Sequence, residues 1–255
     1  MEISLAQLLL SAGMIGLRVT GLMLFAPFFG NAAISPQVKA VLVVAITAVL
    51  FPVYSPHIAG LSLEHWPVAV ASELAVGLAL GLATNLMFEA VLLAGQILSI
   101  QMGYSLVNIL DPTTQVETTV VSVFHQTLAM LIFLRLDVHH WILRGIGKSF
   151  EYLPPGMATV NAGVTNYLLH GAAGVLEAGI QIAAPVLAAT LVADVVLGFL
   201  GKASPQLPLM LLGPGLKSIM GTLILAGALS YWPALFERRF TESIVVSERL
   251  LHLAR

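Results

Sequence analysis

Charged residues are scarce in this sequence, and cysteine is absent. Only 9% of the 255 residues are Asp, Glu, Lys or Arg, whereas soluble domains carry about 25%. With 58% hydrophobic residues, the chain has too few charges to cover a water-exposed surface, so we predict an integral membrane protein. The net charge of −2 argues against nucleic acid as the main partner. The lack of cysteine excludes disulfides and thiolate metal sites.

Motifs of nucleotide hydrolysis and nucleophilic catalysis are also missing. No P-loop, no dinucleotide-binding GxGxxG and no GxSxG occurs in the sequence. His139-His140 with Asp137 could hold a metal, but adjacent helical residues face different directions and no second ligand pair follows. A solvated cluster beside Trp141, at the membrane interface, is the better interpretation. We therefore expect no enzyme activity, no cofactor and no metal.

Long apolar runs divide the chain into about six helical segments, which predicts an all-α membrane protein. The runs are Ile3–Phe29, Val38–Val53, Pro67–Leu110, Val120–Leu136, Tyr167–Phe199 and Leu209–Leu235. The first run is expected to be a retained membrane segment, because Glu2 and Arg18 do not fit a cleaved signal peptide. The third would be about 66 Å long as one straight helix, which exceeds a bilayer core of about 30 Å. It must bend, protrude from the lipid or form two segments.

The connecting stretches are less regular. Asp137–Thr165 is the longest polar-tolerant connector, and Gly213-Pro214-Gly215 interrupts the last apolar run. The tail Phe236–Arg255 mixes charges with apolar residues and is predicted to form an amphipathic helix. Gly77-x-x-x-Gly81 allows a close helix contact. Counting Lys and Arg in the connectors leaves the orientation in the membrane open.

Six charged residues lie inside the apolar runs, where charge is costly and normally faces a bundle interior or an aqueous path. They are Arg18, Glu73, Glu89, Glu177, Asp194 and Lys217. One interpretation is a relay for protons or ions. The other, which we favour, is pairing between helices that fixes their register, because nothing in the spacing isolates a relay.

The stretch Glu89–Pro112 carries polar residues within an apolar region. On a helix with about 100° per residue, five polar or small residues share an arc of about 80°. These are Asn85, Glu89, Gln96, Ser99 and Gly103, whereas Gln101 points elsewhere. Pro112 biases Asp111 away from helix, and the polar run Thr113–Thr119 follows. A buried polar stripe that leads into a polar loop is typical of the working part of a membrane assembly.

A further set of residues is defined by its order and spacing along nearly the whole chain. It consists of Arg18, Ala26-Pro27-Phe28-Phe29, Pro36, Lys39, Glu73, Gly77, Gly81, Glu89, Gly95-Gln96, Gln101-Met102-Gly103, Asp111-Pro112, Ser149-Phe150, Leu153-Pro154, Ser204-Pro205-Gln206, Gly213, Lys217 and Gly221. In this arrangement the chain resembles the FliR family, the flagellar and type III secretion export-gate proteins also called SctT. Family members usually have Asn in place of Pro208 and Pro in place of Gly215. No contact is therefore carried over to that turn.

The resemblance implies a part in protein export rather than catalysis. The chain would join FliP-like and FliQ-like subunits in a gate for unfolded export substrates, together with FlhB-like and FlhA-like proteins. The gate would lie in the bacterial inner membrane, at a flagellar basal body or an injectisome base. Energy would come from the proton motive force and a partner ATPase. The choice between flagellum and host-directed injector stays open, with the resemblance closer to the flagellar proteins.

The resemblance also implies a division of the chain and a set of functional residues. Residues 1–165 would be FliP-like, 166–235 a FliQ-like helical hairpin and 236–255 a charged tail, with helices that need not span the bilayer conventionally. The pore-plugging loop would correspond to Asn108, Asp111, Pro112, Thr113, Thr114, Gln115 and Val116. Contacts between subunits are expected at Glu89, Gln96, Gln101 and Gly103.

Two other functions compete with this one. A small-solute secondary transporter would use Glu177, Asp194 and a helix broken at Gly213-Pro214-Gly215, but no inverted repeat is found. An intramembrane hydrolase rests only on scattered Ser and His residues and ranks far below.

Overall fold

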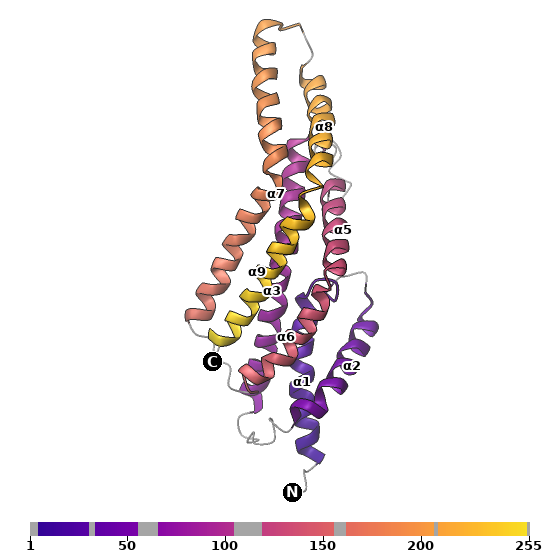
Figure 1. The fold of residues 1–255 in the computed structure, drawn as a ribbon, viewed down its shortest axis with the longest axis vertical. Helices are drawn as coiled ribbons and strands as arrows, with labels where there is room; N and C mark the ends of the chain where they lie inside the picture. The colour runs from indigo at the N-terminus through magenta and orange to yellow at the C-terminus, as the bar shows by residue number, and fades with distance from the viewer. Residues whose placement is uncertain are drawn as a thin grey trace. The chain divides into compact units, whose positions relative to one another are not determined.

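The computed structural model of the chain is helical throughout the residues that it describes, which are 5–30, 34–55, 66–104, 119–155, 162–206 and 209–253. The helices, labelled in Figure 1, are α1 (Leu5–Phe25), α2 (Pro36–Tyr54), α3 (Trp66–Gln101), α5 (Val120–Arg135), α6 (Val138–Tyr152), α7 (Ala162–Ala203), α8 (Leu209–Ala228) and α9 (Trp232–Leu253). The prediction of an all-α membrane protein is confirmed.

Four helices are long and apolar enough to cross a membrane, namely α1, α2, α3 and α7. Two further pairs could each form one bent span: α5 with α6, whose axes differ by 66°, and α8 with α9, whose axes differ by 68°. The described part of the chain thus holds four to six candidate spans.

The third apolar run forms one uninterrupted helix, α3, of 36 residues. At about 1.5 Å per residue it is about 54 Å long, which exceeds a bilayer core of about 30 Å. The alternative of two separate segments is therefore wrong over Trp66–Gln101. A helix of this length must tilt strongly or extend beyond the hydrocarbon.

The interval Asp137–Thr165 is not only a connector, because it contains α6. The expectation was wrong because the histidines and basic residues of this interval conceal an apolar stripe. The residues of the stripe recur every four positions and are all buried: Val138, Ile142, Ile146 and Phe150. This spacing is that of an amphipathic helix.

The last apolar run is also not one segment, because α8 ends at Ala228 and α9 begins at Trp232. Pro214, by contrast, does not break α8, which continues through it. Pro214 is the sixth residue of α8 and has no N–H to donate to the carbonyl four residues earlier, so the helix continues through it with one backbone hydrogen bond fewer. The helix predicted in the tail is confirmed by α9, over Trp232–Leu253.

The chain forms two compact units. Unit 1 comprises Met1–Leu86, Leu134–Ala172 and Phe240–Arg255, and unit 2 comprises Met87–Phe133 and Ala173–Arg239. In unit 1, α1 packs against α2. The buried apolar residues of α1 include Met14, Ile15, Val19 and Leu22.

The core of unit 2 combines parts of α3, α5, α7 and α9. Its buried side chains include Val91, Ala94, Leu98, Ala129, Phe133, Ile182, Val186, Trp232 and Phe236. The buried ring of His125 lies 4.5 Å from that of Trp232, measured between centroids, and its Nδ1 atom lies 2.7 Å from the carbonyl oxygen of Val121. The start of α9 is thereby held against α5.

Helix α2 differs from the others in having no buried residue at all. Its exposed apolar side chains include Val41, Val44 and Val49, with Val49 72% exposed. An apolar helix surface of this kind is normally covered by lipid or by another protein. This feature bears on both proposals below.

Candidate functional site

The deepest charged group of unit 1 is an ion pair between α1 and α3. Arg18 Nε lies 2.7 Å from Glu73 Oε2, and Arg18 Nη2 lies 2.9 Å from Glu73 Oε1. Both side chains are completely buried. Two parallel bonds between guanidinium and carboxylate form the strongest common geometry for such a pair.

The same guanidinium also contacts α6 and the residue that follows it. Arg18 Nη1 donates to Ser149 Oγ at 3.0 Å, and Nη2 donates to the carbonyl oxygen of Leu153 at 3.1 Å. The Phe150 ring stacks on the guanidinium, with its centroid 4.1 Å from Cζ. One arginine therefore joins three segments of unit 1, and this arrangement fixes helix positions instead of lining a path for ions.

Glycines allow α1 and α3 to approach closely beside this pair. A Cβ atom on Gly77 would overlap the carbonyl oxygen of Arg18, and one on Gly21 would lie 2.7 Å from the carbonyl oxygen of Leu74. A Cβ on Gly81 would likewise lie 2.7 Å from the carbonyl oxygen of Leu22. The close contact predicted from Gly77-x-x-x-Gly81 is confirmed.

In unit 2, a polar cluster joins α3, α7 and α8. Lys217 Nζ lies 2.8 Å from Asp194 Oδ1, and Gln101 Nε2 donates to Asp194 Oδ2 at 3.3 Å. We call these three residues the Asp194 cluster. The side chain of Asp194 remains 43% exposed and that of Lys217 18% exposed. The cluster therefore keeps access to solvent or to a partner.

Gly103 ends α3 directly beside the Asp194 cluster. Its φ of +83° is a left-handed conformation that favours glycine. The N–H of Gly103 donates to the Ile100 carbonyl at 3.1 Å, and the N–H of Tyr104 donates to the Ser99 carbonyl at 2.9 Å. These two bonds form a Schellman cap. A Cβ here would also lie 3.0 Å from Cβ of Pro214.

Tyr104, the next residue, connects the end of α3 to α8. Its hydroxyl lies 3.4 Å from Thr222 Oγ1. Hydrogen bonds with Ser218 and Thr222 lower the pKa of the Tyr104 phenol from its ordinary value, against the smaller opposite effect of burial. The C-terminus of α3 is thus held to α8 through side chains as well as through packing.

A second polar contact of unit 2 joins α7 to α9. Arg239 Nη2 lies 3.7 Å from Glu177 Oε1 and donates a hydrogen bond to Gln181 Oε1. Glu177 is 76% exposed, so solvent screens this pair strongly. Of the charged residues identified within apolar runs, Arg18 pairs with Glu73, Asp194 with Lys217, and Glu177 with Arg239.

The residues expected at subunit contacts have different environments. Glu89 is exposed, and Gln96 is partly exposed. Gln101 belongs to the Asp194 cluster, and Gly103 forms the end of α3. Ser99, on the predicted polar stripe, is fully buried and donates to Thr119 Oγ1. The stripe is thus divided between the interior of unit 2 and its surface.

The residues expected to plug the pore lie outside the described part of the chain. They are Asn108, Asp111, Pro112, Thr113, Thr114, Gln115 and Val116. The described chain stops at Tyr104 and resumes at Thr119. The Asp194 cluster and Tyr104 lie beside the N-terminal end of this interval.

Asp137, His139 and His140 lie together at the start of α6. Asp137 Oδ1 is 3.3 Å from His140 Nδ1 and 4.0 Å from His139 Nε2. The two imidazole centroids are 4.1 Å apart, so the expectation that adjacent residues diverge is wrong here. Asp137 precedes α6 and has a left-handed backbone conformation, with φ 54°. The absence of a metal stays a prediction.

The sequence did not show which residues pair in these clusters. Ser149 and the Leu153 carbonyl are 131 and 135 residues from Arg18, and Arg239 is 58 residues from Gln181, so helical spacing does not link them. The usable signal was that Ser149-Phe150 and Leu153-Pro154 belong, with Arg18 and Glu73, to the set of residues that carries the family resemblance.

Comparison with known proteins gives a consistent result across nearly the whole chain. Residues 9–243 match the model of a family described as bacterial export proteins, family 1. Similar curated proteins include the flagellar biosynthetic protein FliR of Bacillus subtilis (strain 168), which is 31% identical over 193 residues, covering 74% of each chain.

Two further relatives carry the same name. The flagellar biosynthetic protein FliR of Pectobacterium carotovorum subsp. carotovorum is 29% identical over 232 residues, covering 88% of this chain and 86% of the relative. That of Escherichia coli (strain K12) is 27% identical over 233 residues, covering 89% and 87%. The similarity therefore extends over both units.

Proposed function

This chain belongs to the bacterial export proteins of family 1, and we infer that it is an export-gate component of a flagellar or type III secretion apparatus. Within this apparatus, we propose that it forms, with FliP-like and FliQ-like subunits, the channel through which unfolded substrates leave the cell. Its role in the channel is structural, and catalysis belongs to other subunits.

The observation that carries this proposal is the large uncovered apolar surface of α2 and α7. The exposed side chains of α7 include Leu176, Ile180, Leu191, Val192, Val195 and Phe199. At 42 residues, α7 would be about 63 Å long if straight, about twice the bilayer core of about 30 Å. Lipid covers only part of such a surface, and partner helices would cover the rest.

The division at residue 165 is part of the proposal. In the FliQ-like hairpin, residues 166–235, α7 and α8 would be the two arms. Lys217 and Asp194 pair between them, and a Cβ on Gly213 would contact the Leu197 side chain at 3.5 Å. These contacts support a hairpin. Residues 1–165 would be the FliP-like part, and residues 236–255 the charged tail.

The interval after Tyr104 is proposed to close the pore. The Schellman cap at Gly103 directs the chain out of α3, and the Asp194 cluster fixes the helix end from which the interval starts. Asp111 to Val116 would then close or line the pore. Within α3, the exposed Glu89 and the partly exposed Gln96 would contact a neighbouring subunit.

The location and the remaining partners follow from the same proposal. The complex would lie in the bacterial inner membrane at the base of the flagellum or injectisome, beside FlhB-like and FlhA-like proteins. The relatives described above are flagellar proteins, which favours the flagellum.

Co-expression tests the proposal directly. The chain is produced with FliP-like and FliQ-like proteins of the same genome, extracted in mild detergent and measured by native mass spectrometry. We expect a stable hetero-oligomer that contains one copy of this chain. A monodisperse species of this chain alone would contradict the proposal.

Glu89→Leu tests the proposed contact on α3. The substitution removes a carboxylate from the exposed face of the helix, and we expect at least a fivefold loss of co-purified partner. Glu242→Leu, at an exposed position of α9, is the matched control and should leave the yield unchanged. Equal yields for both variants would exclude Glu89 from the contact.

Deletion of Thr113–Gln115 tests the pore-closing role. We expect the membrane of cells that carry the assembled complex to leak small solutes, measured by uptake of a normally excluded dye. Replacement of the same three residues by Gly-Ser-Gly keeps the length and is the control. A tight membrane after the deletion would overturn this assignment.

A further inference from the structure

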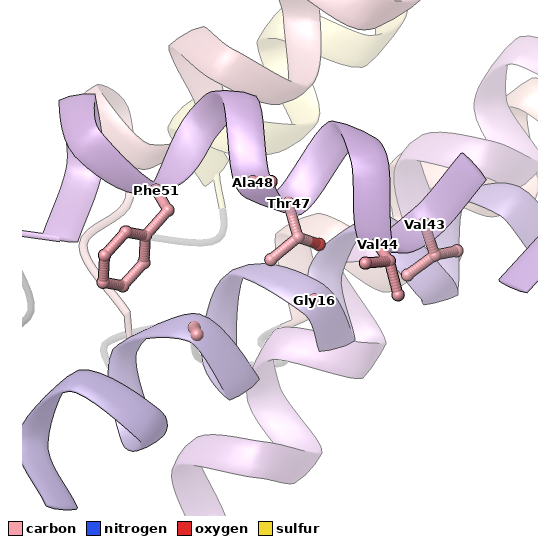
Figure 2. A pocket seen from close by; sticks show the side chains of 7 residues that line it. Gly16, Val43, Val44, Thr47, Ala48 and Phe51 are labelled. Carbon is pink, nitrogen blue, oxygen red and sulfur yellow. The ribbon is translucent and has the colours of Figure 1, made fainter. Parts of the chain in front are cut away.

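A groove lies between α1 and α2 in unit 1, with a volume of about 480 Å³. Figure 2 shows its wall on α2 facing Gly16 of α1. The lining residues are Ala12, Gly16, Val43, Val44, Thr47, Ala48 and Phe51. The volume falls within the range of about 300–1,000 Å³ that is typical of small-ligand sites. Because no charged side chain lines it, the groove fits hydrocarbon better than a polar solute.

Thr47 contributes the one hydroxyl of the lining, and its conformation is unusual. Five other helical threonines donate to the carbonyl four residues earlier: Thr20, Thr84, Thr127, Thr190 and Thr222. Thr47 as a whole is partly exposed, but its Oγ1 atom is shielded from solvent and has no hydrogen-bond partner. It faces Gly16, where an added Cβ would lie 3.5 Å away. A buried hydroxyl without a partner costs free energy unless an occupant supplies an acceptor.

A basic residue, Lys39, lies one helical turn before Val43, the first residue of α2 that lines the groove. Lys39, Val43 and Thr47 follow one another at four-residue spacing, so they share a face of α2. Lys39 Nζ donates one hydrogen bond, to the carbonyl oxygen of Gly30 at 3.0 Å. An ammonium group has three protons, so it keeps donors for an anion. Lys39 precedes Thr47 by about 12 Å along the helix.

The surroundings favour a lipid over a helix as the occupant. The groove opens on the exposed apolar face of α2, on which Val41 and Val44 are each 68% exposed. Helix contacts in membranes are enriched in small residues, which let two backbones approach closely. The lining contains small residues, Ala12, Gly16 and Ala48, but also Val44 and Phe51, whose larger side chains keep a partner backbone away. A flexible acyl chain does not have this restriction.

We propose that the groove between α1 and α2 binds one acyl chain of an anionic phospholipid, whose phosphate pairs with Lys39. The glycerol region lies beside Val43 and Val44, one turn from Lys39, where an ester oxygen comes within reach of the Thr47 hydroxyl after rotation about χ1. The acyl chain continues along Ala48 and Phe51. This site is separate from the gate function and does not depend on it.

Native mass spectrometry of the full chain in detergent, with phosphatidylglycerol or phosphatidylcholine added, tests the proposal. We expect one tightly retained phosphatidylglycerol, preferred about fivefold over phosphatidylcholine, which is what one basic residue near the membrane surface supplies. Lys39→Gln should abolish this preference while leaving acyl-chain binding. Equal retention of both lipids by the unchanged protein would overturn the proposal.

Gly16→Leu fills the groove from α1, and its Cβ meets only an ordinary contact with Thr47. We expect the retained lipid to be lost. Gly13→Leu is the matched control, because nothing lies within 4 Å of a Cβ at that position, and it should keep the lipid. If Gly16→Leu does not fold, Ala48→Phe fills the groove from α2. Retention of the lipid by a folded, filled variant would overturn the site.

A photoreactive benzophenone residue in place of Val44 distinguishes the alternative occupant. In the assembled export complex, we expect cross-links to phospholipid. Cross-links to a partner protein instead would show that a helix occupies the groove, and the proposal would then be wrong.

Discussion

The Arg18–Glu73 pair of unit 1 and the Asp194–Lys217 pair of unit 2 both join two helices within apolar sequence, but their environments differ. The first is fully buried, bidentate and supported by Ser149 and the Leu153 carbonyl. The second has a single short contact, and its carboxylate is 43% exposed. The same chemistry therefore serves two different purposes.

Burial decides between these purposes. A charge in a dry interior has no alternative partner, so the Arg18 group holds the helices in one arrangement and loses much if either partner is removed. A charge that reaches solvent exchanges its partner for water at little cost. The Asp194 cluster can therefore exchange its partners for water, whereas the Arg18 group cannot.

Glu73→Gln should have the largest effect. It leaves the Arg18 guanidinium buried without its carboxylate, so we expect a loss of about 3–5 kcal/mol in the free energy of unfolding. Unfolding in SDS, followed by circular dichroism, measures it.

The double variant Arg18→Leu with Glu73→Leu is the control for this result. It removes both charges, and most of the stability should return, because apolar residues often replace a buried pair without loss. If the single variant is as stable as the unchanged protein, the pair does not hold unit 1 together.

Gly77→Ala should have an intermediate effect. The added Cβ overlaps the Arg18 carbonyl oxygen and pushes α1 away from α3, which should cost about 1–3 kcal/mol of stability. Gly13→Ala is the matched control on α1, where the Cβ has open space. It should be neutral or gain about 0.5–1 kcal/mol through its better helix propensity. Similar melting temperatures for both variants would indicate that α1 and α3 are not tightly packed.

Lys217→Gln should have the smallest effect on stability, below about 1 kcal/mol. The Asp194 carboxylate keeps its bond from Gln101 and its access to solvent. Export, measured as swimming in soft agar by a complemented strain, should suffer more than stability. The charge swap Asp194→Lys with Lys217→Asp should restore swimming. A stability loss as large as that of Glu73→Gln would remove the distinction between the two pairs.

Helices with a uniform apolar character were predictable from the sequence. Composition alone predicted the membrane class, and the runs around α1, α2, α3 and α7 matched helices. Where polarity and helix periodicity overlap, the prediction was wrong. The histidines and basic residues of α6 concealed the stripe of Val138, Ile142, Ile146 and Phe150, because a count of polar residues does not see which face they occupy.

Pairing between helices was predicted only as a class. Sequence showed that Arg18, Glu73, Asp194 and Lys217 needed partners, because lipid provides none. It did not show which residues would pair, since the partners lie 55 residues apart in one pair and 23 in the other, from the numbering. The roles of the interval Asn108–Val116 and of Glu89 stay predictions that rest on the resemblance.

The sequence by itself determined that this is a membrane protein, that it is helical and to which family it belongs, because these depend on composition and on residue order along the chain. Only the tertiary structure decided which charges are buried and which are exposed. It also decided that Gly77 contacts a backbone and that Thr47 faces a groove. These properties depend on which segments distant in the chain come to lie side by side, and local sequence carries no record of that.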